Sequence, residues 1–174
     1  MKKLALIIIP LILASCQSNS YYNAMNTNEQ RFDGWQKENA IFLTETHDQI
    51  LLIEDLSELA QKSATLRETY LLAEDIEEEM ADLQLTYQVE ATIHRIKLAS
   101  ALSEPSDQIL HKLESISDDN FDQVYLQYLK SELSDLQKEA VDYKKEGHNE
   151  RIRELADKVN DLINDLNETN KQLS

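Results

Sequence analysis

The sequence predicts an all-α protein, an antiparallel bundle of four long helices with one short connecting helix. Apolar residues recur at intervals of three and four along most of the chain, which is the spacing of one helix face. No stretch alternates apolar and polar residues as a half-buried strand does. The 174 residues include two glycines and two prolines, and after residue 37 only Gly147 and Pro105 remain. Long uninterrupted helices are therefore expected.

The first two long helices are predicted over residues 38–62 and 66–99, with Thr65 as N-cap of the second. The expected buried face of the first comprises Ile41, Phe42, Leu52, Ile53, Leu56, Leu59 and Ala60. The expected buried face of the second comprises Thr69, Ala73, Ile76, Met80, Leu83, Tyr87, Ala91, His94 and Leu98. Its later half carries a second apolar line of Leu85, Val89, Ile93 and Ile96. This half should be covered on two sides, by another helix, the N-terminal segment or a second subunit.

The second half of the chain predicts a short helix and two further long ones. The short helix is expected to begin with Ser106 as its N-cap. The next helix begins at Asp118 and ends near Gly147, a natural C′ residue, and the last begins near Asn149. The expected buried face of the third long helix comprises Phe121, Tyr125, Tyr128, Leu129, Leu136, Ala140 and Tyr143. That of the last comprises Ile152, Leu155, Val159, Leu162, Ile163 and Leu166.

The N-terminus has the form of a secretory signal peptide, because two lysines precede an apolar run over residues 4–13 that is too short to span a membrane. The Leu-Ala-Ser-Cys stretch at 13–16 resembles the lipobox of bacterial lipoproteins. The resemblance implies cleavage before Cys16 and acylation of Cys16 with three chains, enough for a permanent anchor. Because Gln17 and not aspartate follows, the resemblance points to the outer membrane. We expect the protein on its periplasmic face, although the sequence leaves exposure on the cell surface open. The alternative is a signal peptide with an incidental cysteine at its cleavage site.

These boundaries predict a signal peptide at 1–15, a lipidated tether at 16–37 and a helical domain at 38–174. The tether is predicted because its residues are polar and rich in Asn and Ser. Removing the signal leaves 15 basic and 33 acidic residues, a net charge of −18 with the histidines neutral. Such a surface repels nucleic acid and anionic lipid headgroups, and it favours a basic protein partner or diffusely held divalent cations.

The domain also carries residues typical of a known family. The most specific are the turn at 111–116 and the Phe-Asp-x-x-Tyr stretch that begins at Phe121; the Phe-Leu-Thr stretch at Phe42 and the run at 58–62 also fit. On these residues, the chain from 42 to 173 resembles a bacterial family of unknown function, whose members are secreted or lipid-anchored and are often labelled outer-membrane proteins. The resemblance implies a ferritin-like four-helix bundle.

The chain departs from that family where metal chemistry would be expected. Members often carry an acidic-acidic-His triplet on two helices, but the corresponding stretches here are Glu-Glu-Glu at 77–79 and Ser-Glu-Leu at 131–133. A di-iron site needs a Glu-x-x-His pair on each of two helices. The residues three before the four histidines are Thr44, Ala91, Gln108 and Lys145. The sequence therefore predicts no metal site and no cofactor.

Three polar residues nevertheless fall on predicted buried faces: Glu45, His94 and Glu132. A buried carboxylate needs a hydrogen-bond donor, so Glu132 is expected to contact a tyrosine hydroxyl or His94. The functional interpretation is a remnant polar site in the core of the bundle. The alternative is a satisfied buried contact, or a position at the open end of the bundle.

No nucleophile motif and no glycine-rich phosphate loop occurs, so the protein is not expected to be an enzyme. The first hypothesis is a lipid-anchored, periplasmic helical bundle that serves as a structural or interaction module of the envelope. The second is an acidic lipoprotein that binds and inhibits a basic periplasmic protein, as an inhibitor or immunity factor. The third, a metal-binding ferritin-like stress protein, rests on fold analogy alone.

Overall fold

The computed structural model describes residues 20–173, and every regular element in that range is a helix. The helices are α1 (Tyr21–Arg31), α2 (Gly34–Ser63), α3 (Arg67–His94), α4 (Glu104–Glu114), α5 (Asp118–Glu146) and α6 (Glu150–Leu173). The prediction of an all-α fold is confirmed for this part of the chain. The predicted signal peptide and Cys16 lie outside the described residues.

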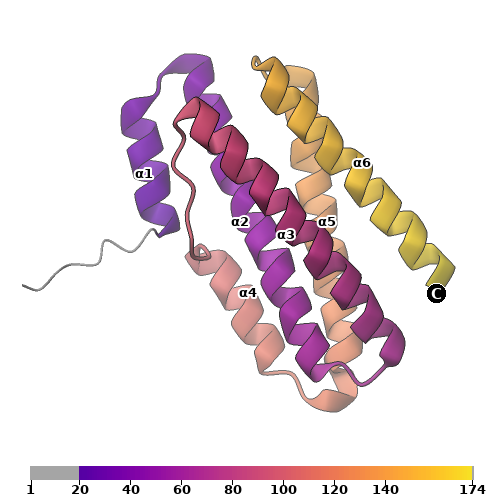
Figure 1. Cartoon of the computed structure of the whole chain (residues 1–174). Coiled ribbons are helices and arrows are strands. Elements are labelled where there is room, and N and C mark those ends of the chain that lie inside the picture. Colours follow the sequence, from indigo (N-terminus) through magenta and orange to yellow (C-terminus); the bar gives the residue numbers. More distant parts are fainter. Residues whose placement is uncertain (1–19, 174) are drawn as a thin grey trace, which may run out of the picture.

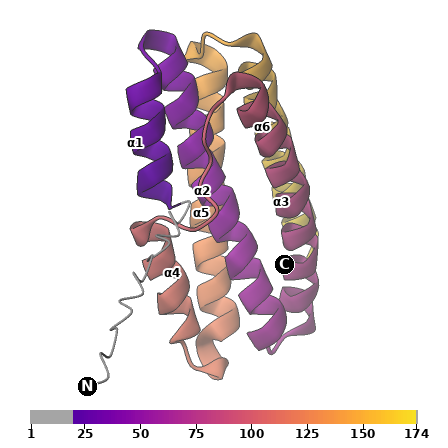
Figure 2. The same ribbon diagram turned by 60° about the vertical axis from the view of Figure 1, so that its left-hand side comes forward.

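The four long helices lie side by side and each runs antiparallel to the long helices that it contacts (Figure 1). α2 packs against both α3 and α5, whereas α6 packs mainly against α5. α1 and α4 follow one another along the side of α2 that is turned away from α6 (Figure 2). α2 is therefore the helix that touches most of the others.

The core follows the predicted helical periodicity. Most of the residues predicted for the buried faces are buried, with Tyr87 and Tyr125 among the largest side chains that are fully enclosed. The half-buried exceptions are Ile41, Leu59, His94, Leu98, Tyr128, Tyr143 and Leu162. Each large apolar side chain buried in this way contributes about 1.5–3 kcal/mol relative to exposure. Small positions such as Ala60 and Ala140 are also fully buried.

Residues 20–37, which their composition predicted to be a tether, are instead largely helical. α1 begins after Ser20, whose hydroxyl accepts a hydrogen bond from the backbone N–H of Asn23 at 3.3 Å. The helix buries Ala24 and Asn28 and packs against α2. Because its buried positions are one small and one polar residue, apolar periodicity does not reveal this helix.

α3 ends at His94 and not near residue 99 as predicted. Arg95 has a φ of 57°, a left-handed conformation that ends the helix. Residues 95–103 then run as an irregular strap toward α4 (Figure 2). The side-chain amide of Asn28 donates to the carbonyl of Lys97 at 2.8 Å and accepts its N–H at 2.9 Å, so α1 holds the strap in place.

Two buried aspartates determine where α3 and α4 begin. Asp48 accepts the backbone N–H of Ser103 at 2.6 Å and the hydroxyls of Ser103 and Ser106 at 2.7 Å each. The N-cap of α4 is consequently Ser103, three residues before the predicted one. Asp122 accepts the N–H and the hydroxyl of Thr65 at 3.0 and 2.6 Å, so Thr65 is a donor to α5 and not the N-cap of α3.

The second apolar line of α3 is exposed to solvent. Leu85, Val89 and Ile93 are 59%, 56% and 51% exposed, whereas Ile96 is buried. No described element supplies the expected cover for the first three. Of the helices within residues 20–173, none has the length and apolar character needed to cross a lipid bilayer.

Candidate functional site

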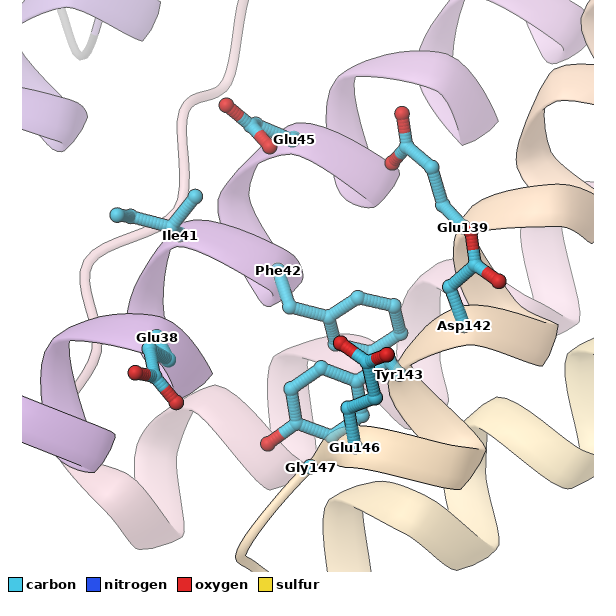
Figure 3. Close-up of a pocket in the computed structure, with 9 residues that line it drawn as sticks. All are labelled: Glu38, Ile41, Phe42, Glu45, Glu139, Asp142, Tyr143, Glu146 and Gly147. Carbon is cyan, nitrogen blue, oxygen red and sulfur yellow. The ribbon is translucent and has the colours of Figure 1, made fainter.

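A groove of about 420 Å³ opens between the N-terminal half of α2 and the C-terminal turns of α5 (Figure 3). It is lined by Glu38, Ile41, Phe42, Glu45, Glu139, Asp142, Tyr143, Glu146 and Gly147. Five of these nine residues carry carboxylates and none is basic. The C-terminal end of α5 adds the partial negative charge of a helix terminus. The groove is therefore a region of strongly negative potential.

Stacked aromatic rings join the two walls of the groove. The rings of Phe42 and Tyr143 lie 4.0 Å apart between centroids, with 18° between their planes. The hydroxyl of Tyr143 donates a short hydrogen bond to the side-chain oxygen of Asn39, which is buried in α2. Burial, with Glu38 nearby, raises the pKa of Tyr143 to about 12. The phenol thus remains a neutral donor at physiological pH, and the stack fixes the spacing of the walls.

Gly147 ends α5 as predicted, but for a different reason. Its φ is −63°, so the left-handed conformation usual for a C′ glycine is absent. A Cβ atom at this position would lie 2.7 Å from Cζ of Tyr143 and 2.6 Å from the carbonyl oxygen of the same residue. Glycine is required here because of space, since any side chain would displace the Tyr143 ring from its stack.

Glu45 and Glu139 stand on opposite walls at the same end of the groove (Figure 3). Burial raises the pKa of both carboxyl groups, and the charge of Glu45 raises that of Glu139 further. Gln49 donates to Glu139 at 3.2 Å. The pKa of Tyr21, at the start of α1, is also raised to about 12. Burial is the larger cause and the charge of Glu45 the next. A cation placed between the two carboxylates would relieve their repulsion and the cost of their burial.

Cationic groups near the groove lie at its rim. Nδ1 of His148 lies 3.4 Å from a carboxylate oxygen of Glu38, and both side chains are 62% exposed. Lys138 and Arg153 lower the pKa of Glu139 and of Tyr143 respectively, but in each case burial outweighs them. The charge of the groove walls is therefore largely uncompensated.

Comparison with known proteins identifies the family. Residues 25–173 match the family model DUF4142, described as a domain of unknown function. The chain belongs to this family. No curated protein and no solved structure matches it.

The Phe-Asp-x-x-Tyr stretch of this DUF4142 domain has a structural role. The rings of Phe121 and Tyr125 are buried and nearly parallel, with centroids 6.5 Å apart. The hydroxyl of Tyr125 shares a 3.1 Å hydrogen bond with that of Ser57 on α2. Burial alone would raise the pKa of Asp122, but hydrogen bonds from Thr65 and its neighbours outweigh burial and hold the pKa below its usual value. The stretch thus joins α5 to α2 and to the start of α3.

The predicted core residue Glu132 does not reach the groove. It is half-buried on α5, and the enclosed core position is taken by Leu133. Burial, with the charges of Asp135 and Asp48, raises the pKa of Glu132. Within the described residues, Glu132 forms no hydrogen bond to a tyrosine hydroxyl or to His94. The hydroxyls of Tyr125 and Tyr143 bond to Ser57 and Asn39, and His94 lies beside Glu90.

His94 lies elsewhere, beside a cavity of about 50 Å³ that is also lined by Phe32 and Trp35. Its Nε2 is 3.8 Å from a carboxylate oxygen of Glu90. That carboxylate is bound at 2.6 and 3.1 Å by two nitrogens of Arg151, which fastens α6 to α3. Of the three predicted core residues, only Glu45 belongs to the groove.

The described part of the chain has no group of three or more His, Cys, Asp or Glu side chains arranged to hold a metal ion. The groove carboxylates alternate with aromatic and aliphatic residues along the two walls, so they do not converge on one point.

The groove itself was missed by reasoning from apolar faces, although its acidic residues follow a regular spacing. Glu38 and Glu45 are seven residues apart, as are Glu132, Glu139 and Glu146. Residues seven apart lie on nearly the same side of a helix. Two acidic heptad lines on separate helices are a signal that a shared acidic surface could exist.

Proposed function

We propose that this protein is a non-enzymatic, lipid-anchored interaction module of the bacterial envelope, whose acidic groove holds Lys or Arg side chains of a basic partner protein. The folded domain is a ferritin-like four-helix bundle, held at the periplasmic face of the outer membrane by acylated Cys16. An inhibitor or immunity factor directed at a basic periplasmic protein would act in this way.

The observation that carries the proposal is the groove between α2 and α5, with five carboxylates and no basic residue in its lining. Part of its charge is costly to hold in the absence of a ligand, since burial raises the pKa of both Glu45 and Glu139. The stacked rings of Phe42 and Tyr143 add a surface on which the aliphatic part of a long cationic side chain can rest. A positive ligand therefore gains both charge neutralisation and apolar contact.

The field of the whole chain supports the same partner. The net charge of −16 over the full sequence would accelerate the approach of a basic protein and slow that of an acidic one. The Leu-Ala-Ser-Cys stretch and Gln17 support the anchor and its destination. The four long antiparallel helices, with the short α4 beside them, are compatible with the ferritin-like bundle that the family resemblance implies.

The test is a calorimetric titration of the purified full chain with an oligolysine peptide and, separately, with an oligoarginine peptide. Glu45→Gln combined with Glu139→Gln should weaken binding by about tenfold, because two half-buried carboxylates each lose a contact worth about 0.7 kcal/mol. The affinity of the parent should also fall as salt rises.

The matched control is Glu74→Gln combined with Glu79→Gln, which removes the same charge from two exposed positions of α3. This variant should bind with nearly the parent affinity. Equal weakening in the two double variants would mean that the peptides respond to the diffuse field and not to the groove. Unchanged binding in the groove variant would also overturn the proposal.

The anchor has a separate test. Cys16→Ala should accumulate as an unprocessed precursor without lipid, whereas the parent should be recovered from the outer membrane. A variant that is still processed and still fractionates with the outer membrane would refute acylation of Cys16, whatever the groove binds.

A further inference from the structure

The later half of α3 differs from the rest of this acidic protein. Residues 67–82 contain eight charged side chains, whereas residues 83–94 contain Glu90 as the one carboxylate, with no Lys or Arg. Glu90 is neutralised locally, because Arg151 binds it through two nitrogens. In a chain with 29% charged residues, such depletion is typical of the centre of a protein interface.

The same half carries the exposed apolar line. Leu85, Val89 and Ile93 follow one another at intervals of four residues, and more than half of each side chain faces solvent. The opposite side of the helix is the buried one, with Tyr87 and Ala91 in the core. The line therefore lies along the outer surface of the molecule, where no described helix covers it.

The two ends of the line carry opposite charges. Asp82 and Glu78 continue it toward the start of α3, three and seven residues before Leu85. Near the other end, Arg95 follows Ile93 by two residues, and the guanidinium of Arg31 donates to the carbonyl of Arg95 at 2.6 Å. A helix with an acidic end, an apolar centre and a basic end is complementary to an antiparallel copy of itself.

We infer that this face is an interaction surface for a second copy of the chain, which pairs α3 with α3 in antiparallel orientation about a twofold axis at Val89. In this register Val89 meets Val89 of the second copy, and Leu85 meets Ile93. Asp82 of each copy then lies near Arg95 of the other. Such a self-complementary contact closes with two copies and does not propagate into a filament.

A basic partner fits this face less well, because the apolar line itself presents no carboxylate that is free of a cation.

The dimer is expected to be weak. Three side chains per copy bury far less than the roughly 1,200 Å² of a stable interface. The net charge of −16 on each copy opposes association, so added salt should strengthen the dimer. Salt has the opposite effect on the cationic ligand proposed for the groove.

The test is oxidative cross-linking of the full chain in membranes and after purification, with Val89→Cys compared with Glu79→Cys and with the parent, which controls for Cys16. Val89→Cys should form at least about fivefold more covalent dimer than either control, because only a residue on the twofold axis meets itself. Leu85→Cys and Ile93→Cys should cross-link poorly alone and efficiently when the two are mixed. Val89→Lys should abolish the non-covalent dimer. Its helical circular dichroism should remain that of the parent.

The inference fails if Val89→Cys cross-links no better than Glu79→Cys, or if Leu85→Cys alone cross-links as well as its mixture with Ile93→Cys. It also fails if the dimer fraction does not rise between about 50 and 500 mM NaCl. None of these outcomes bears on peptide binding in the groove, so the two proposals stand or fall separately.

Discussion

Gly147 and Tyr143 are in such close contact that a Cβ atom at residue 147 would lie 2.7 Å from Cζ of the tyrosine. The ring that occupies this space stacks on Phe42 and joins α5 to α2. One glycine at a helix end therefore controls how an aromatic residue sits in the wall of the acidic groove. The contact depends on the absence of a side chain and not on an unusual backbone conformation.

Gly147→Ala should destabilise the protein by about 1–3 kcal/mol, because the new methyl group overpacks against the ring and the carbonyl of Tyr143. Urea unfolding measures the loss. Tyr143→Leu in the same chain should recover only part of it, since the carbonyl oxygen would still lie 2.6 Å from the Cβ atom.

Gly34→Ala is the matched comparison for this change. No atom of the described part of the chain lies within 4 Å of a Cβ atom at Gly34, but its φ is +51°. Gly34→Ala should lower the free energy of unfolding by about 1 kcal/mol through backbone conformation alone. Tyr143→Leu should not alter that loss. If the Tyr143 substitution modified both glycine variants equally, overpacking would not be the cause.

The helices that bury leucine, isoleucine and tyrosine on one face could be predicted from the sequence, because burial of such residues forces their spacing. α1 could not, since Ala24 and Asn28 are its buried residues and neither is strongly apolar. The end of α3 could not either. The chain turns at Arg95 with neither glycine nor proline, because Asn28 binds both polar backbone groups of Lys97.

One candidate site residue of the groove was predicted from the sequence, but the groove itself was not. Glu45 was predicted because it interrupts an apolar face. Glu139 was not predicted, although it lies seven residues after Glu132 on nearly the same side of α5. Glu132 was predicted to make a core contact, but it is half-buried, and its neighbour Leu133 takes the enclosed position. Both residues fall near the edge of the same helical face, where spacing alone does not decide which of two neighbours is enclosed.

Asp48→Ala should destabilise the protein by about 3 kcal/mol, because the buried amide and two hydroxyls at the start of α4 would lose their charged acceptor. Hydrogen exchange should show loss of protection at the amide of Ser103. Asp107→Ala removes an exposed carboxylate of the same helix and should cost much less. Equal effects would mean that helix charge, and not the buried acceptor, stabilises this end of α4.

Glu54 should make the protein less stable at alkaline pH. Burial, with the charges of Asp55, Glu58 and Glu77, raises its pKa from 4.5 to about 7. The folded state therefore binds this proton more tightly than the unfolded state does. The resulting stabilisation is complete below pH 4.5 and is lost as the pH rises through about 7.

Glu54→Gln should accordingly raise the urea midpoint at pH 8 relative to the parent, and the difference should shrink toward pH 5. Glu74→Gln, which removes an exposed carboxylate from α3, serves as the control and should show a smaller change with pH. A Glu54→Gln effect of the same size at both pH values would mean that the pKa of Glu54 is not raised.

His47 should act in the opposite direction at acidic pH. It is 3% exposed, and neither ring nitrogen has a hydrogen-bond partner among residues 20–173. Burial lowers its pKa from 6.5 to about 4, against the opposing charge of Asp48. The unfolded state therefore binds the proton more tightly, and stability falls as the pH drops from about 6.5 to 4. The full loss is on the order of 3 kcal/mol.

His47→Leu should remove this loss, because leucine has no charge to acquire and no polar atom to leave unpaired. Urea unfolding at pH 7 and pH 4.5 should give a smaller difference for the variant than for the parent. His111→Leu is the control, since that ring is exposed on α4 and its protonation is favoured by Asp107 in the folded state. The buried imidazole is refuted as the source if His47→Leu loses as much stability between the two pH values as the parent does.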